Sequence, residues 1–171
     1  MNRGVETTFE ANFDEWAAQN QQPLVSYAYL VCRDREEARD ISQDVLLAVH
    51  RQWQHLVRQG DPLAYARRSI TNACIDGWRR HGRHLAPLPP SGERPQDGDE
   101  PGRTTDALLA WQLCGELPPH QRAVVVLRYW ADLPHREIAM VLGMPEATVR
   151  SHLHRALAAM QPRLTREDLK S

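Results

Sequence analysis

The chain has 171 residues, of which 42% are hydrophobic and 25% are charged, and its formal net charge is −1. This composition is typical of a soluble globular protein with one domain or two small ones. It excludes a globally basic protein, so a nucleic-acid surface has to concentrate its positive charge locally. Cys32, Cys74 and Cys114 are far apart and form no CxxC pair, which predicts small buried thiols in a reducing cytoplasm. The sequence shows no long apolar run typical of a signal peptide or a membrane span.

Apolar residues at helical spacing divide the first eighty residues into four predicted helices. The first covers 6–20, and the second begins at Pro23, since proline is favoured in the first turn of a helix. The third covers 37–56, and a polar turn at 59–62 separates it from the fourth. The N-terminal half is therefore predicted to be entirely helical.

The predicted third helix has an unusual face opposite its apolar one. Asp40, Gln43, Asp44 and Leu47 follow one another at helical spacing. An exposed leucine beside two carboxylates and an amide is suited to docking a partner protein. The same pattern is equally typical of a solvated acidic face with one stray leucine, which needs no explanation. Spacing alone favours the solvated face.

The predicted fourth helix, 63–84, carries two stripes at i, i+3, i+4, i+7 spacing. Small and apolar residues form the first stripe, which has to be buried. An aromatic ring, an amide and basic groups form the second, as a surface that holds a nucleic-acid backbone and stacks on bases requires. An arginine-rich solvated face is the competing interpretation. The candidate nucleic-acid residues are Tyr65, Arg68, Asn72, Asp76, Arg79, Arg80 and Arg83.

Residues 87–102 are rich in proline, glycine and charge, which predicts a flexible or extended linker. We therefore expect an all-α protein with an N-terminal helical domain at 6–84, a linker at 85–104 and a C-terminal domain at 105–168. Two small domains on a tether suit bipartite DNA binding, because tethering raises the effective concentration of the second contact.

The C-terminal half has the pattern of a helix-turn-helix. A short helix is predicted at 133–142, Gly143 is placed as a left-handed cap, and Pro145 begins the next helix. That helix has one apolar face and one polar-basic face, as a recognition helix in the major groove requires. The candidate residues on its polar face are Thr148, Arg150, Ser151, His152, His154 and Arg155.

Motifs of the common enzyme classes are missing from the sequence. It has no glycine-rich phosphate loop, no HExxH and no nucleophile elbow. His152 and His154 are two residues apart, so their side chains diverge on a helix and do not suit a metal. We expect no catalytic residues, no metal and no cofactor.

Several sequence blocks, in this order, resemble the extracytoplasmic-function sigma factors of bacterial RNA polymerase, and within them the sigma-E-like subgroup. Residues 38–45 look like the polymerase-docking helix of that family. Residues 65–72, Asp76 and 78–80 look like its promoter-melting helix, which reads the −10 element. The blocks that look like its −35-reading domain are 117–122, 127–129, 137–139 and 148–156.

The resemblance implies a protein that docks on core RNA polymerase, binds the −35 duplex and holds melted −10 DNA. It makes Asp40, Gln43, Asp44 and Leu47 the polymerase contact, and it assigns the pocket for an extruded base largely to the loop at 55–62. Tyr65 stands where many members have tryptophan and Ala66 where many have leucine. Many members are also silenced by an anti-sigma protein. The alternative is a helix-turn-helix regulator that binds duplex DNA without joining the polymerase.

Overall fold

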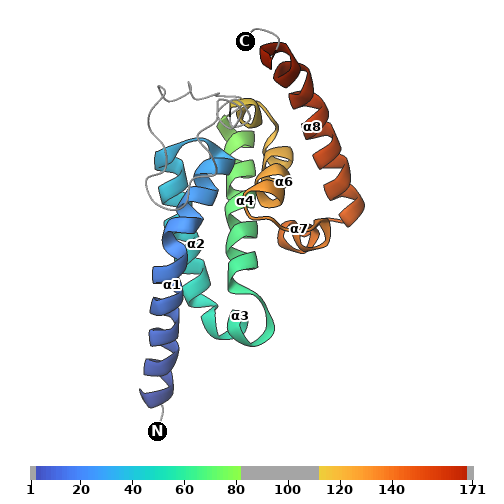
Figure 1. The fold of residues 1–171 in the computed structure, drawn as a ribbon. Helices are drawn as coiled ribbons and strands as arrows, with labels where there is room; N and C mark the ends of the chain where they lie inside the picture. The colour runs from blue at the N-terminus through green and yellow to red at the C-terminus, as the bar shows by residue number, and fades with distance from the viewer. Residues whose placement is uncertain (1–2, 82–111, 169–171) are drawn as a thin grey trace.

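The structure is a computed structural model that describes the backbone of residues 3–81 and 112–168 and the side chains of residues 12–80 and 112–161. Throughout these ranges the regular structure is helical, which confirms the predicted all-α class. The helices stand side by side, with α1 and α2 at one edge, α4 in the middle and α6 to α8 at the other edge (Figure 1). None of the helices described is long and apolar enough to cross a membrane. The helices are α1 (Arg3–Cys32), α2 (Arg35–Arg51), α3 (Trp53–Gln59), α4 (Pro62–His81), α6 (Pro119–Tyr129), α7 (His135–Leu142) and α8 (Glu146–Asp168).

The prediction of separate helices before and after Pro23 is wrong, because α1 continues through this proline. A proline inside a helix removes one backbone hydrogen bond and usually kinks the helix. Pro23 lies on the exposed side of α1, where water can reach the carbonyl that loses its partner. Beyond it, Leu24, Tyr27 and Val31 are buried as the helical spacing predicts.

The predicted helix at 37–56 is two helices, because the chain breaks at Gln52 between α2 and α3. Gln52 has a φ of −109° and a ψ of 11°, outside helical values, and its N–H donates to the last carbonyls of α2. The start of α2 is capped by Asp34, whose carboxylate accepts a 2.8 Å hydrogen bond from the N–H of Glu37. These two caps fix the length of α2, the helix that carries the predicted docking face.

The C-terminal half contains the predicted helix-turn-helix. Helix α7 ends at Gly143, which has a φ of +63°, a conformation that favours glycine over any residue with a Cβ. Helix α8 follows, and its apolar stripe of Val149, Leu153, Ala156 and Met160 is buried as predicted. The turn therefore sets the angle at which α8 leaves α7.

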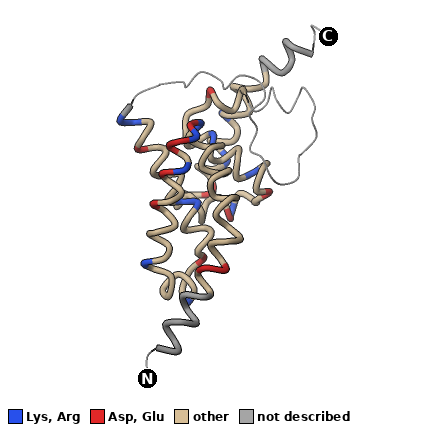
Figure 2. The backbone as a smooth tube through the Cα atoms, turned by 90° about the vertical axis from the view of Figure 1, so that its left-hand side faces the viewer, with Lys and Arg blue, Asp and Glu red and all other residues tan. Residues whose placement is uncertain are grey.

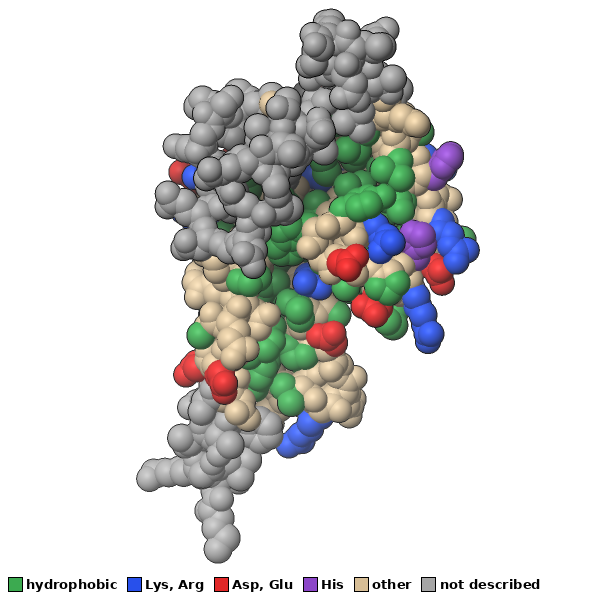
Figure 3. Space-filling view, in the orientation of Figure 1, with side chains coloured by type: hydrophobic (Ala, Val, Ile, Leu, Met, Phe, Trp, Pro, Cys, Tyr) green, Lys and Arg blue, Asp and Glu red, His purple; other side chains and the backbone are tan. Residues whose placement is uncertain are grey.

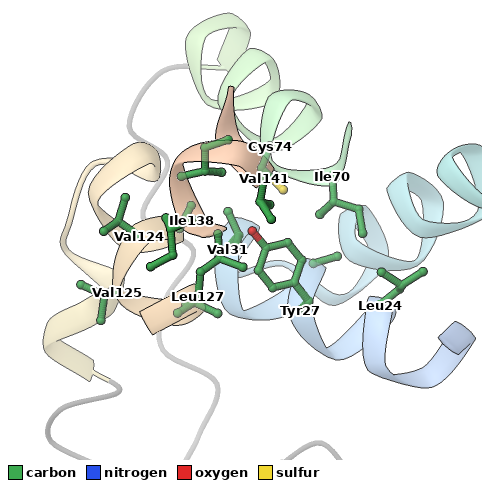
Figure 4. Packing of buried hydrophobic residues seen from close by; sticks show 14 of the residues in the cluster. Leu24, Tyr27, Val31, Ile70, Cys74, Val124, Val125, Leu127, Ile138 and Val141 are labelled. Carbon is green, nitrogen blue, oxygen red and sulfur yellow. The ribbon is translucent and has the colours of Figure 1, made fainter. Parts of the chain in front are cut away.

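The two halves of the chain pack together around Tyr27, which is fully buried (Figure 4). Its ring lies among side chains of α4, including Ile70, and side chains of α6 and α7, including Leu127 and Ile138. The phenol oxygen and the hydroxyl of Thr71 are 2.7 Å apart, so this buried polar group is hydrogen-bonded. One continuous apolar core thus runs through both halves, which the sequence did not predict.

Trp130 lies where helical spacing predicts a core residue. With Val124, Val125 and Leu127 it forms the apolar set of a helix that the sequence predicts after Pro118, yet it is 43% exposed. The reason is that α6 ends at Tyr129, and Trp130 caps the helix instead of continuing its stripe. Its ring lies against the ring of Tyr27, with the centroids 6.2 Å apart. Trp130 therefore covers one side of the junction between the halves.

The predicted domain limits of 6–84 and 105–168 stay a proposal. The linker predicted at 85–104 lies outside the described residues, as does Arg83. The sequence also predicts a helix from Thr105 or Asp106 to Leu117, of which the structure describes only residues from 112 onward.

Candidate polymerase and DNA interface

The predicted docking residues lie together on the exposed face of α2. Asp40, Gln43 and Asp44 are exposed, and Leu47 is 54% exposed, unusually open for a leucine. The opposite face of α2 is buried and includes Ala38, Val45 and Val49. A helix with one buried face and an exposed acidic face ending in a leucine presents both charge and apolar area to a partner.

This face borders a groove of about 600 Å³ between α2, α4 and α6. Four acidic residues of α2 line it, and α4 contributes Trp78 and Arg80 on the other wall. Cys32, Cys74 and Arg122 also line the groove, so it reaches the junction between the two halves. The acidic residues are Glu36, Glu37, Asp40 and Asp44.

The predicted −10 residues of α4 that the structure describes lie on one side of the helix. Arg68, Asn72, Asp76, Arg79 and Arg80 are exposed, whereas Tyr65 is half-buried. Its phenol oxygen accepts a 2.9 Å hydrogen bond from the Nε2 of Gln52, which ties α4 to the break between α2 and α3. The apolar stripe of α4 is turned inward, and Ala66, Ile70, Cys74 and Gly77 are buried.

Asp76 organises the basic end of this stripe. Its carboxylate lies 3.8 Å from the guanidinium of Arg79, and its backbone carbonyl accepts a 3.3 Å hydrogen bond from Arg80. Both arginines are exposed, so these contacts contribute little to stability. Their effect is to hold two guanidinium groups along the helix surface, where a phosphate backbone can approach them.

The turn of the helix-turn-helix lies directly against α4. A Cβ added to Gly143 would come within 2.5 Å of the guanidinium of Arg68. The backbone at the turn and the Arg68 side chain are therefore in close contact. This places a residue predicted to bind −10 DNA beside the motif predicted to read −35 DNA.

The predicted reading face of α8 is mostly exposed. Arg150, Ser151, His154 and Arg155 are exposed, while Thr148 is half-buried. Arg150 makes a 2.5 Å ion pair with Glu146 one turn earlier, which orients its guanidinium along the helix. Histidine and arginine side chains gather at the α7–α8 edge of the molecule (Figure 3).

His152 differs from its neighbours because it is half-buried and stacks on His120 at the start of α6. The ring centroids are 5.8 Å apart and the planes differ by 7°. Burial lowers the pKa of His120, and the nearby His152 and Arg79 lower it further. Burial also lowers the pKa of His152, with a smaller contribution from Arg155. Two groups predicted to bind separate DNA elements, Arg79 and His152, thus both lie close enough to His120 to lower its pKa.

Sequence reasoning did not identify the contacts between the halves or the role of Arg122. This arginine is buried, and its Nη2 donates to the carbonyls of Gly115 and Leu117 at 3.0 and 2.9 Å. From the sequence, a single arginine at the start of a predicted helix cannot be distinguished from an arginine exposed to solvent. Acidic and basic residues also intermix along the described chain, so charge alone marks no DNA-binding end (Figure 2).

Two family models match the chain in succession. Residues 16–84 match "Sigma-70 region 2", which includes α2 and α4. Residues 108–160 match "Sigma-70, region 4", which includes α6, α7 and most of α8. The chain is 33% identical to the RNA polymerase sigma-E factor of Streptomyces coelicolor, over 92% of this chain and 88% of that protein. It is also 33% identical to the ECF RNA polymerase sigma factor SigL of Mycobacterium tuberculosis, over 93% and 89%.

The fold is also that of a solved sigma factor. The structure of RpoE from Bartonella quintana, in complex with the anti-sigma factor NepR, matches with a TM-score of 0.67 at 17% identity, covering 91% of this chain and 97% of RpoE. At this identity the likeness concerns the fold alone. The matching regions, their order and the identity to sigma-E over most of its length lead to one conclusion: the chain belongs to the extracytoplasmic-function sigma factors of bacterial RNA polymerase, in the sigma-E-like group.

Proposed function

We propose that the exposed face of α2 is the surface by which this sigma factor docks on core RNA polymerase. As a sigma factor the chain directs transcription initiation at specific promoters. The observation that carries the docking assignment is the joint exposure of Asp40, Gln43, Asp44 and Leu47 on one side of a helix in region 2. Carboxylates pair with basic groups of a partner helix, and the leucine adds apolar contact.

We propose that α4 holds the melted −10 element. The ring of Tyr65 stacks on a base, Asn72 hydrogen-bonds the captured strand, and Arg68, Arg79, Arg80 and Arg83 contact phosphates. Asp76 keeps Arg79 and Arg80 in position. Extruding a base costs a few kcal/mol of stacking, which contacts in a pocket at residues 55–62 offset. The sequence predicts a loop there, whereas residues 55–59 belong to helix α3 and only 60–61 form the turn before α4.

We propose that α8 binds the −35 duplex. Its polar face carries short side chains with arginines, which suit base edges and phosphates in the major groove. Arg155, Ser151 and His154 are exposed and reach DNA directly. Thr148, Arg150 and His152 complete the surface, and His152 reaches it once it leaves its stack on His120.

We propose that the two halves separate when both promoter elements are bound. The elements are about 25 base pairs apart, which is about 85 Å of duplex at 3.4 Å per base pair. In the structure Arg68 of α4 contacts Gly143 of the helix-turn-helix, far short of that distance. Residues 82–111, at about 3.3 Å each when fully extended, are long enough to span it. This difference in distance supports assigning the packed arrangement to the protein that is not bound to a promoter.

We further propose that the protein has no catalytic chemistry of its own and acts in the cytoplasm on a polymerase that supplies the chemistry. An anti-sigma protein is a fitting regulator, since the structurally similar RpoE was solved with one. A plain helix-turn-helix regulator is disfavoured, because the N-terminal half matches sigma region 2.

The test is transcription in vitro with purified core polymerase, together with core binding. Asp44→Arg, and Asp40→Arg with Gln43→Ala, should abolish core binding and transcription while circular dichroism stays unchanged. Asp14→Arg, an exposed acid on α1, is the matched control and should behave like the wild type. Near-normal core affinity of the folded α2 variants would rule out the docking assignment.

A further inference from the structure

The three cysteines, which are far apart in the sequence, meet at the junction between the two halves. The guanidinium of Arg122 lies close enough to Cys32, Cys74 and Cys114 to interact electrostatically with each of them. Cys32 is the last residue of α1 and is half-buried, whereas Cys74 on α4 and Cys114 before α6 are buried. Cys32 and Cys74 both line the groove between α2, α4 and α6. None of the proposed polymerase or DNA contacts uses these thiols.

Two of the thiols contact each other directly. The side chains of Cys32 and Cys74 form a hydrogen bond. The thiol of Cys32 donates its single proton to the backbone carbonyl of Asp34, with Sγ 3.2 Å from the oxygen. The side chains of Cys32 and Cys74 therefore interact where both line the groove between α2, α4 and α6.

We propose that Cys32 and Cys74 are a peroxide-oxidised thiol pair that forms a reversible disulfide within region 2. Cys32 reacts first, because it is the more exposed of the two sulfurs and opens onto the groove. The hydrogen bond to Cys32 and burial raise the pKa of Cys74, so that thiol stays protonated until Cys32 has reacted.

The reaction balances with a hydroperoxide as the only oxidant. The thiolate of Cys32 attacks one peroxide oxygen, an S–O bond forms, the O–O bond breaks, and hydroxide leaves and is protonated to water. Cys74 then attacks the sulfur of the resulting sulfenic acid. The S–S bond forms, the S–O bond breaks, and the hydroxyl group leaves with the thiol proton as a second water. Two thiols have lost two electrons and two protons, and hydrogen peroxide has become two waters.

The position of the pair links its oxidation to the packing of the halves. Val31, the neighbour of Cys32, accepts a hydrogen bond from Arg122 through its backbone carbonyl. A disulfide brings the two sulfurs to about 2.05 Å, well inside the contact distance of two thiols. The end of α1 then moves toward α4, next to the bond that holds the C-terminal half.

The test is peptide mapping of the full chain after treatment with hydrogen peroxide. Trypsin places each cysteine in a separate peptide, at 4–33, 69–79 and 104–122. We expect the count of free thiols in the denatured chain to fall from three to one. The peptides 4–33 and 69–79 should become linked, while 104–122 stays reduced, and dithiothreitol should restore all three thiols.

Three variants sharpen the assignment. Cys114→Ser should form the same disulfide and is the matched control. Cys74→Ser should stop at a sulfenic acid on Cys32, which dimedone traps as an adduct on peptide 4–33, and Cys32→Ser should give neither product. An unchanged thiol count in the wild type, a disulfide that includes Cys114, or links only between two chains would each overturn the proposal. The peptide map of the wild-type protein tests the proposed disulfide even where a variant fails to fold.

Discussion

Arg122 donates a hydrogen bond from its Nη1 to the backbone carbonyl of Val31, although the two residues are 91 positions apart in the chain. The same guanidinium binds the carbonyls of Gly115 and Leu117, so one buried side chain holds the end of α1 and the segment before α6. Burial lowers the pKa of Arg122, yet an arginine keeps its charge throughout the physiological range. Its charge therefore stays available to three carbonyls that lack solvent.

Replacing Arg122 with methionine should destabilise the protein by about 3 kcal/mol, because it leaves buried carbonyls without donors. Urea unfolding followed by circular dichroism measures this loss. Arg128→Met on the same helix is the matched control, since Arg128 is half-exposed and donates one 3.2 Å hydrogen bond to Leu133. Equal losses in the two variants would contradict the role given to Arg122.

The contact between Gly143 and Arg68 can be measured with a double-mutant cycle. Gly143→Ala should destabilise the protein by about 1–2 kcal/mol through its left-handed backbone alone. It should cost more in the wild-type background than beside Arg68→Ala, because the new methyl group displaces the guanidinium. A coupling of at least about 0.5 kcal/mol in urea unfolding is expected. Strictly additive effects would show that the turn and α4 do not touch in solution.

The stacked pair His120 and His152 predicts a pH dependence of stability. Both pKa values are lowered in the folded protein, so the unfolded chain takes up protons first as the pH falls. The stability contributed by the neutral pair is complete above the unfolded value of about 6.5 and is lost as the pH falls toward the folded values. Urea unfolding at pH 7.5 and 5.5 should show a smaller pH dependence in His120→Gln than in the wild type. An identical pH dependence of stability in His120→Gln and the wild type would show that the histidine pair does not cause it.

Opening of the promoter should be separable from binding of the −35 duplex. Tyr65→Ala should leave core and −35 binding intact and reduce open complex roughly ten- to a hundredfold, since a stacking aromatic is worth about 1–3 kcal/mol per base. Tyr65→Phe keeps the ring and loses only the hydrogen bond from Gln52, so it should behave nearly as the wild type. Permanganate reactivity of the −10 region measures the effect. A template mismatched across −10 should rescue Tyr65→Ala more than Asn72→Ala if the ring promotes melting.

Periodicity was enough to predict the helical class, the helix-turn-helix and the buried stripes of α4 and α8. It failed at Pro23 and Gln52, since local rules do not reveal whether a proline faces solvent or where a helix pauses. It also gave no sign that Thr71 and Ile75 of α4 are buried, because burial of this kind depends on tertiary contacts such as that between Thr71 and Tyr27 of α1. The three cysteines near Arg122 could not be predicted to meet either, because only the tertiary fold brings these distant parts of the chain together.

The central claim is that the two halves, packed around Tyr27 in the free protein, separate to read two promoter elements at once. The direct measurement is energy transfer between fluorophores on unnatural amino acids at Val57 of α3 and Leu157 of α8, both exposed. The energy-transfer measurement is valid only if the labelled protein supports transcription by core polymerase. We predict high transfer in the free protein and a loss of transfer, equivalent to a lengthening by tens of ångströms, once core polymerase and promoter DNA are bound. Unchanged transfer in a complex that initiates transcription would contradict the claim.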